Sequence, residues 1–268
     1  MDWFLLPPLL VIGALIGFLA GLLGIGGGLS LVPLLTILFT LRNFPHAHVV
    51  HMAVATATST MVFTATSSMH AHQRRGAVLW QVVLAMAPGI VIGSLIGPQI
   101  AAALPTREFA AIFAAFTWFA AYRMVFPRPV KADRALPGRA GLFGVGAGIG
   151  TIASMVGAGG AFLAVPFLGR HNVKIQNAVG TSAAIGVPVA IAATFGFVLA
   201  GLRQQGLPPW SLGFVYLPAM AAIVVASTLA APVGASLAHR WPAVKLRRSF
   251  ALLLFVLGGY MIWKAIRG

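Results

Sequence analysis

The chain has 268 residues, of which 59% are apolar and 8% charged, and it contains no cysteine. A soluble domain needs roughly 25% charged residues, so this composition excludes both a soluble globular protein and a disordered chain. Without cysteine there is no disulfide framework, thiolate metal site or thiol nucleophile. The net charge of +15 does not indicate nucleic acid, because the basic residues lie between long apolar runs and not in a stripe with interleaved aromatic residues. The composition predicts an integral membrane protein.

Long apolar stretches, near the length of about 20 residues that a helix needs to cross a bilayer, predict the membrane spans in chain order. The first follows Met1 without a basic leader or a small-residue cleavage site, so we expect it to stay in the mature protein. Two further stretches, 29–41 and 161–169, follow glycine runs and are too short to cross unaided. The expected spans are 3–23, 49–70, 77–103, 108–126, 140–156, 178–200, 211–238 and 249–266.

The second half of the chain repeats the first. The matching residues keep their order, which indicates a first membrane repeat (1–126), a linker (127–139) and a second membrane repeat (140–268). In the first pair of segments, Gly13, Gly17, Gly24, Gly26, Gly27, Val32 and Pro33 match Gly146, Gly150, Gly157, Gly159, Gly160, Val165 and Pro166. Farther along, 53–57 match 178–182, and Gly76, Trp80 and Pro88 match Gly206, Trp210 and Pro218.

The linker carries basic residues and prolines and is expected to be cytoplasmic, because cytoplasmic loops collect Lys and Arg. If each half has five crossing segments, most of the 18 Lys and Arg residues lie on the linker side. If the short stretches dip in and return on the same side, the basic residues divide almost evenly. The odd count is favoured, and it inverts the second half relative to the first, as in secondary transporters.

The expected fold is therefore an all-α integral membrane protein. It consists of two inverted-topology repeats of about five helical segments each, with both termini outside and the glycine-broken short helices meeting near mid-membrane.

The glycine runs are the first candidates for function. Gly24, Gly26, Gly27 and Gly28 are expected to break a helix at depth, where irregular backbone is tolerated only in protein or at a cavity. The restarting helix would then point free N–H groups at this spot, which favours an anion. The alternative is that the glycines serve helix packing alone. Consecutive glycines cost roughly 1 kcal/mol each relative to alanine, more than contact requires.

Hydroxyl and amide side chains lie near both breaks and can bind an anion without a full positive charge. The alternative is that each hydroxyl bonds back to a carbonyl of its own helix. Thr56 and Thr181 are favoured because they occupy matching positions. The substrate-binding residues predicted from the sequence are Gly24, Gly26, Gly27, Gly28, Ser30, Thr56, Thr58, Ser59, Gly157, Gly159, Gly160, Gln176, Asn177, Thr181 and Ser182.

The histidines do not predict a metal site, because 46–51 and 70–72 are expected at opposite faces and have no carboxylate nearby. His48 and His51 share a helical face and are predicted to form a polar gate or an anion-attracting vestibule; the alternative is that most histidines are interfacial. No cofactor is expected.

The acids Asp2, Glu108 and Asp133 lie at the terminus, at a helix edge and in the linker, which disfavours a cation as cargo. An inside-negative potential contributes about 2.3 kcal/mol per 100 mV to the exit of a monovalent anion, so export needs no coupling ion. An intramembrane hydrolase with Ser59 or Ser182 is disfavoured because no histidine is expected at mid-depth. A passive anion channel stays open as an alternative, and a purely structural membrane protein ranks low.

The duplicated motif resembles the TauE/SafE sulfite exporter family, also called the toluene sulfonate uptake permeases, over residues 10–266. The resemblance is carried by Gly24-Ile25-Gly26-Gly27-Gly28 with Val32-Pro33, by Gly157-Ala158-Gly159-Gly160 with Val165-Pro166, and by 53–56 and 178–182. It implies a multi-pass carrier, not an enzyme, in a bacterial or archaeal inner membrane. Sulfite, sulfoacetate or another organosulfonate would be exported by alternating access, or taken up with a coupling ion. The expected partners are this small anion and the lipid bilayer, with no nucleic acid, and a homodimer is compatible with the sequence.

Overall fold

The computed structural model describes residues 3–23, 27–126, 135–238 and 243–267. Seven helices in this part are long and apolar enough to cross a membrane, so the all-α membrane class is confirmed. The elements are η1 (Trp3–Leu5), α1 (Leu6–Leu23), α2 (Gly28–Leu41), α3 (Val49–Gln73), α4 (Trp80–Ala103), α5 (Thr106–Val125), α6 (Arg139–Val156), α7 (Ala161–Arg170), α8 (Ile175–Gly201), β1 (Ser211–Leu212), β2 (Val215–Tyr216), α9 (Leu217–Ala238) and α10 (Ala243–Arg267).

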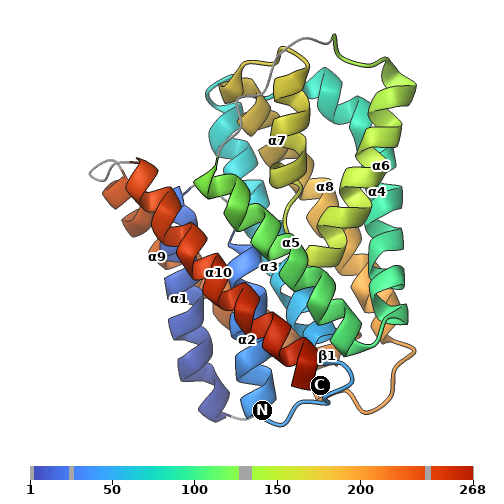
Figure 1. The fold of residues 1–268 in the computed structure, drawn as a ribbon, viewed down its shortest axis with the longest axis vertical. Helices are drawn as coiled ribbons and strands as arrows, with labels where there is room; N and C mark the ends of the chain where they lie inside the picture. The colour runs from blue at the N-terminus through green and yellow to red at the C-terminus, as the bar shows by residue number, and fades with distance from the viewer. Residues whose placement is uncertain (1–2, 24–26, 127–134, 239–242, 268) are drawn as a thin grey trace.

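The helices define two ends of the molecule (Figure 1). Helix α1 begins and α10 ends at one of them, here called the termini end. Helix α5 ends and α6 begins at the opposite one, the linker end. The two halves of the chain therefore start from opposite ends, which is the direction expected for an odd number of segments in each half.

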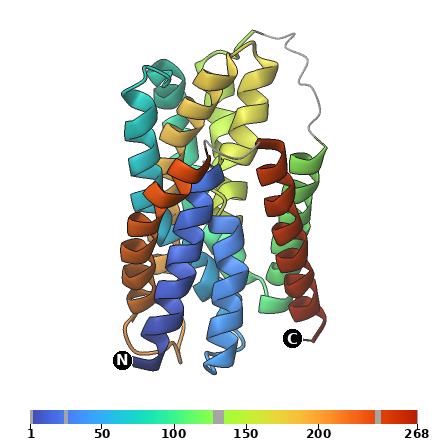
Figure 2. The same cartoon turned by 90° about the vertical axis from the view of Figure 1, so that its left-hand side faces the viewer.

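The two short helices each cover only part of this length. Helix α2 has 14 residues and α7 has 10, or roughly 21 and 15 Å at 1.5 Å per residue, against a hydrocarbon core of about 30 Å. Helix α2 runs back to the termini end (Figure 2), where the Arg42 guanidinium donates to the Phe4 carbonyl at 2.7 Å. Helix α7 runs from the middle to the linker end.

The start of the expected span 211–238 is wrong. Residues 211–216 form a two-stranded antiparallel hairpin, and α9 begins only at Leu217. Trp210 and Gly213 adopt positive φ values of 70° and 56°, which a helix does not allow. The match of Trp80 with Trp210 in the sequence repeat therefore does not correspond to equivalent positions in the fold. Trp80 begins α4, whereas Trp210 precedes the hairpin.

The first helix of each half packs against the fourth helix of the other half. Helix α1 lies along α9 (Figure 2), and α4 lies along α6 (Figure 1). Glycines allow the close approach: Gly13 faces Ile223 and Gly17 faces Ser227. In the same way, Gly146 faces Met86 and Gly150 faces Ile90. Small residues that let helix backbones approach closely are typical of membrane helix interfaces.

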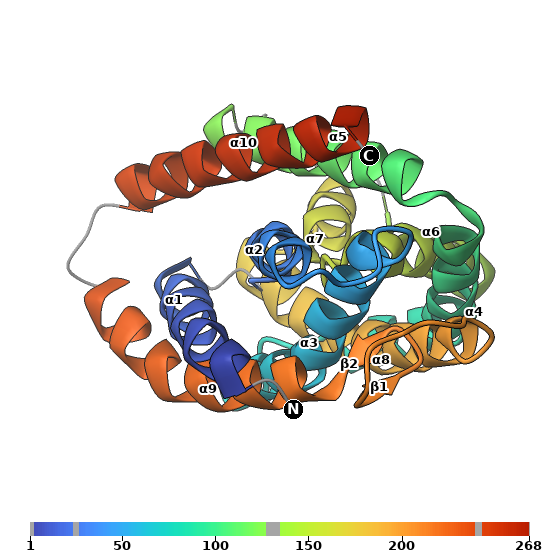
Figure 3. The same cartoon turned by 90° about the horizontal axis from the view of Figure 1, so that it is seen from below.

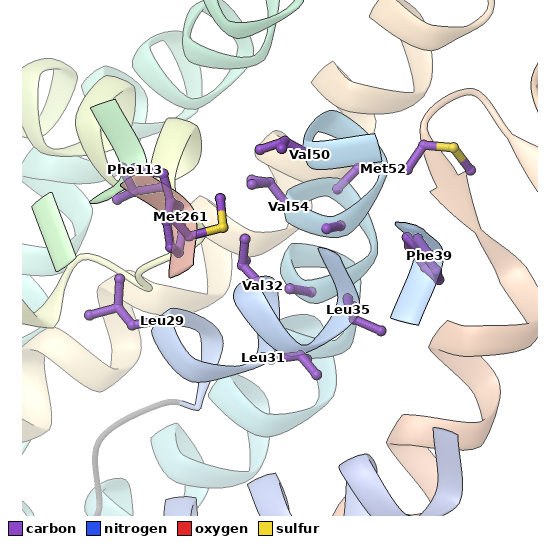
Figure 4. Packing of buried hydrophobic residues seen from close by; sticks show 14 of the residues in the cluster. Leu29, Leu31, Val32, Leu35, Phe39, Val50, Met52, Val54, Phe113 and Met261 are labelled. Atoms are coloured by element: carbon purple, nitrogen blue, oxygen red, sulfur yellow. The ribbon is translucent and has the colours of Figure 1, made fainter. Parts of the chain in front are cut away.

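The remaining helices complete the bundle around α3 and α8, which pack on each other. Helices α5 and α10 lie side by side along one edge, with α2 and α7 between them and the centre (Figure 3). Helix α2 contributes Leu29, Leu31, Val32 and Leu35 to a buried cluster that also contains Val54. Phe113 and Met261, from α5 and α10, close this cluster on the other side (Figure 4).

We predict that Gly150→Ala destabilises the protein and Gly148→Ala does not. A Cβ at Gly150 would lie 2.5 Å from the Ile90 carbonyl oxygen, whereas a Cβ at Gly148 would have no neighbour within 4 Å. Overpacking costs about 1–3 kcal/mol, and an exposed Gly→Ala change in a helix gains up to about 1 kcal/mol. Thermal unfolding in detergent should show a lower midpoint for Gly150→Ala only; equal midpoints would contradict the close packing of α4 and α6.

Candidate functional site

The second glycine run interrupts the backbone between α6 and α7. Gly157, Gly159 and Gly160 have φ values of 59°, 48° and 75°, which place them in the left-handed region. This region costs a non-glycine residue free energy, so the run produces the break that the sequence predicts. At the first run, α2 begins at Gly28 after a turn at Gly27. Gly24 and Gly26 lie outside the described residues.

The two breaks lie in direct contact. A Cβ added to Gly28 would collide with the carbonyl oxygen of Gly157 and would lie 3.1 Å from the Met61 sulfur. A Cβ at Gly157 would in turn lie 3.3 Å from the Thr58 hydroxyl. Both interruptions therefore meet beside the middle of α3, and glycine is required at Gly28 because another backbone approaches so closely.

A pocket of about 170 Å³ opens from this junction toward the linker end. A buried water needs roughly 10–15 Å³ of such space, so the pocket has room for a small anion. Met61 and Gly159 line its inner part, and Ser68 and His72 line the part nearer the end of α3. Other lining residues come from α7, α8 and the end of α1: Ala20, Ala161, Phe162, Val165, Val179, Ser182, Ala183 and Gly186.

The pocket also contains the beginning of α7. Ala161 and Phe162 are its first two residues and line the pocket. The first N–H groups of a helix have no acceptor within the helix. In α7 the first intrahelical bonds run from Leu163 and Ala164 to the Gly160 carbonyl, so the N–H groups of Ala161 and Phe162 precede them. The helix dipole adds partial positive charge at this point, and the arrangement favours an anion.

Most of the predicted hydroxyl groups donate their proton to their own helix. Ser182 lines the pocket, yet its hydroxyl donates to the Ala178 carbonyl at 2.7 Å. An anion needs a donated proton, so these hydroxyls do not offer one to it in this conformation. The other three pairs are Ser30 to Gly27 at 3.0 Å, Thr58 to Val54 at 2.7 Å and Ser59 to Thr56 at 2.7 Å.

Thr56 and Thr181 are fully buried and lie outside the pocket lining. Their hydroxyl oxygens accept backbone N–H groups from another part of the chain. At the start of α8, Gln176 is exposed and Asn177 donates to the Ala77 carbonyl at 3.3 Å. These four residues do not line the pocket, and their role in binding stays a prediction.

The two predicted gate histidines lie at the termini end. His51 is only 2% exposed, and its Nε2 lies 2.9 Å from the Ala101 carbonyl oxygen. Its ring packs against Phe109 and Phe214, with centroids 4.9 and 5.4 Å away. His48 is half-buried beside Phe214, and burial lowers the pKa of its side chain. His51 therefore belongs to a closed aromatic contact, and its role as a gate stays a prediction.

Among the described residues, no group of three or more His, Asp or Glu side chains is placed to hold a metal ion.

Sequence reasoning missed the polar face of α3 that lines the pocket. Thr64, Ser68 and His72 follow each other at intervals of four residues and all line it. Residues four apart share one face of a helix. This spacing within an apolar span was a signal that the sequence already contained.

Comparison with known proteins agrees with this architecture. The chain belongs to the family described as "Sulfite exporter TauE/SafE", whose profile matches residues 9–261. The resemblance seen in the glycine motifs is thus confirmed. The chain is a multi-pass membrane protein of a transporter family.

Several relatives carry similar descriptions. A "Probable membrane transporter protein" of Haemophilus influenzae is 36% identical over 268 residues, covering 98% of this chain and 100% of the relative. The "Probable membrane transporter protein YdhB" of Bacillus subtilis is 24% identical over 91% of this chain and 95% of its own length. A relative from Methanocaldococcus jannaschii, with the same description and the designation MJ0441, is 21% identical over 96% of each chain. No solved structure matches the chain.

We predict that a cysteine replacing Ser68 reacts with a polar maleimide much faster than one replacing Ala193. Ser68 lines the pocket, whereas Ala193, its match in the sequence repeat, is fully buried toward the other end of α8. The chain has no cysteine of its own, so each single variant carries one thiol. Labelling in open membranes, followed by mass spectrometry, gives the two rates. Equal rates would show that the pocket is not open to the linker end alone.

Proposed function

We propose that the protein carries a small sulfur-containing anion, such as sulfite, sulfoacetate or another organosulfonate, across the membrane by alternating access. The observation that supports this best is the pocket at the meeting point of the two helix breaks, whose lining includes the first two residues of α7. Three features of a sulfonate or sulfite suit such a site: negative charge, small size and several acceptor oxygens. The family description adds the sulfur-containing class of cargo.

The charges around the pocket favour an anion over a cation. In the part of the chain that the structure describes, no carboxylate lines the pocket, and His72 is its one titratable lining residue. Among the described residues the one acid is Glu108, in the first turn of α5 at the termini end. Peptide dipoles and a histidine attract an anion without holding it by a full opposite charge, which suits a carrier that must release its cargo.

The one-sided pocket supports a carrier over a passive channel. On α3 and α8 the sequence repeat matches Ser182 with Ala57 and Ser68 with Ala193. Ser182 and Ser68 line the pocket, whereas Ala57 and Ala193 are fully buried. A channel needs a continuous path, but an alternating-access carrier opens to one side at a time. The two halves run in opposite directions, which supports an inverted repeat. In such a repeat the two halves can exchange conformations, which gives a second state of matching shape that opens to the other side.

We further propose that the linker end faces the cytoplasm and that the anion is exported. Arg74 and Arg75 follow α3 at this end, and Arg170 and Lys174 flank the end of α7. This clustering agrees with the excess of basic residues in cytoplasmic loops. The pocket would then load from the cytoplasm, and the membrane potential would favour exit of the anion. Uptake of a sulfonate with a coupling ion is the alternative.

The test is flux in liposomes. The purified protein should take up or release labelled sulfite or sulfoacetate, saturate with concentration and show counterflow. Flux without saturation or counterflow would identify a passive channel. No flux of any sulfonate or inorganic anion, together with no thermal stabilisation by a panel of them, would contradict the proposal, because a bound ligand raises the stability of the folded state.

We predict that Ala183→Leu greatly reduces flux, while Ala115→Leu leaves it unchanged. Ala183 lines the pocket on α8, so a larger side chain there fills space that the cargo needs. Ala115 is exposed on α5, and the same change there only adds apolar surface toward the lipid. Flux in proteoliposomes, normalised to the amount of folded protein, checks the prediction. Equal flux in both variants would place the cargo site elsewhere.

A further inference from the structure

Two buried threonines each hydrogen-bond a helix of one half of the chain to the start of a helix of the other half. Thr56, on α3, accepts the backbone N–H of Tyr216 at 3.0 Å, directly before α9 begins. Thr181, on α8, accepts the backbone N–H of Leu79 at 3.0 Å, directly before α4 begins. Both threonines are 0% exposed, and they match each other in the sequence repeat. The third helix of each half thus holds the start of the fourth helix of the other half.

The packing of the helices also groups the fourth helix of each half with the first three helices of the other half. One buried cluster joins α4 and α6 with α7 and the first part of α8. The other joins α1, α2 and the first part of α3 with α9, together with α5 and α10, and it also includes residues near the ends of α4, α6 and α8: Ala101, Val156, Phe197 and Ala200. Each cluster therefore contains the first three helices of one half and the fourth helix of the other. The glycine contacts of α1 with α9 and of α4 with α6 lie inside these units, not between them.

The pocket lies between the two units. On one side it is lined by α3 and the end of α1, with Met61 and Ser68 among its residues. On the other side it is lined by α7, α8 and the preceding break, with Phe162 and Ala183 among its residues. At the termini end the units close on each other, because Phe197 and Ala200 of α8 join the cluster that contains the start of α3.

We infer that two units move during transport, one made of α1, α2, α3 and α9 and the other of α6, α7, α8 and α4. In each unit the fourth helix comes from the other half of the chain, and Thr56 and Thr181 are positioning residues that keep α9 and α4 in place there. This inference rests on the proposed alternating access and differs from a motion of one sequence repeat against the other. The contact of α3 with α8 is then the surface that opens and closes. The threonine bonds stay intact, because each lies within a single unit.

The threonine bonds are tested by paired substitutions. Thr56→Val and Thr181→Val remove the acceptor at nearly constant shape, whereas Thr56→Ser and Thr181→Ser keep it. We expect both valine variants to lower the maximal flux severalfold at an unchanged half-saturating concentration, and both serine variants to restore it. Thr117→Val, which removes a buried hydroxyl that bonds within α5, is the control. An increase in the half-saturating concentration alone would make these residues cargo ligands and overturn their positioning role.

The moving units are tested by two disulfides that both join a helix of the first half to α8. Ala65→Cys with Gly186→Cys links α3 to α8 across the two units, and Pro98→Cys with Gly196→Cys links α4 to α8 within one unit. A Cβ on Gly186 would lie 3.5 Å from that of Ala65, and one on Gly196 would lie 3.2 Å from that of Pro98. These separations are at or within a few tenths of an ångström of disulfide geometry.

The readout does not require the cargo to be known. Ala57→Cys is added to each pair, and a membrane-impermeant maleimide is applied from the side of the termini end. Ala57 is buried in this conformation, so its labelling reports opening at that end. We expect labelling in the reduced proteins and in the oxidised 98–196 pair, and loss of labelling in the oxidised 65–186 pair. If the sequence repeats moved against each other, both disulfides would abolish it.

Loss of labelling in the oxidised 98–196 pair would overturn the inference, as would a reduced protein that never becomes labelled. Flux measured in the same variants separates this result from the proposed function. Labelling in the expected pattern without flux of any tested anion would contradict the proposed anion cargo but not the proposed moving units. Flux that persists in the oxidised 65–186 pair would contradict the proposed moving units but not the proposed cargo.

Discussion

The architecture depends on one constraint, which is that a backbone interrupted inside a bilayer has no water to satisfy its N–H and C=O groups. The interruption at Gly157, Gly159 and Gly160 is therefore stable only because protein surrounds it: α3 covers one side and α8 the other. The contact of Gly28 with Gly157 brings the break before α2 to the same place. Ala161 and Phe162, whose N–H groups precede the first intrahelical bonds of α7, line the pocket, so the candidate site follows from the need to bury the break.

The kind of donor at the site has a functional consequence. Hydroxyl protons near the breaks, such as those of Ser182 and Thr58, are donated to carbonyls of their own helices. The positive potential therefore comes mainly from the start of α7, because the peptide dipoles there are fixed by the fold. Dipoles held in place attract an anion without the tight binding of a salt bridge. This balance suits the proposed anion carrier, which must release its cargo on the other side.

The exchange of fourth helices explains why so many glycines lie at helix contacts. Gly13 and Gly17 bring α1 against α9, and Gly146 and Gly150 bring α6 against α4. In a bilayer the hydrophobic effect does not drive helices together, so close van der Waals contact and hydrogen bonds must do so. The bonds accepted by Thr56 and Thr181 add a directional element to this contact. The result is two units whose mutual boundary, and not their interior, contains the pocket.

The sequence by itself determined the membrane class, the position of the spans and the two breaks, because these depend on local composition: apolar length sets a span, and glycine admits positive φ. It also indicated the family. Only the tertiary structure decided which polar groups share the pocket, because this depends on which helix faces which. Thr56, predicted as a ligand, accepts the backbone N–H of Tyr216 from the other half and does not line the pocket, whereas His72, which was not among the predicted site residues, lines it. The late start of α9 was also missed, because a short hairpin and the first turns of a membrane helix can consist of equally apolar residues.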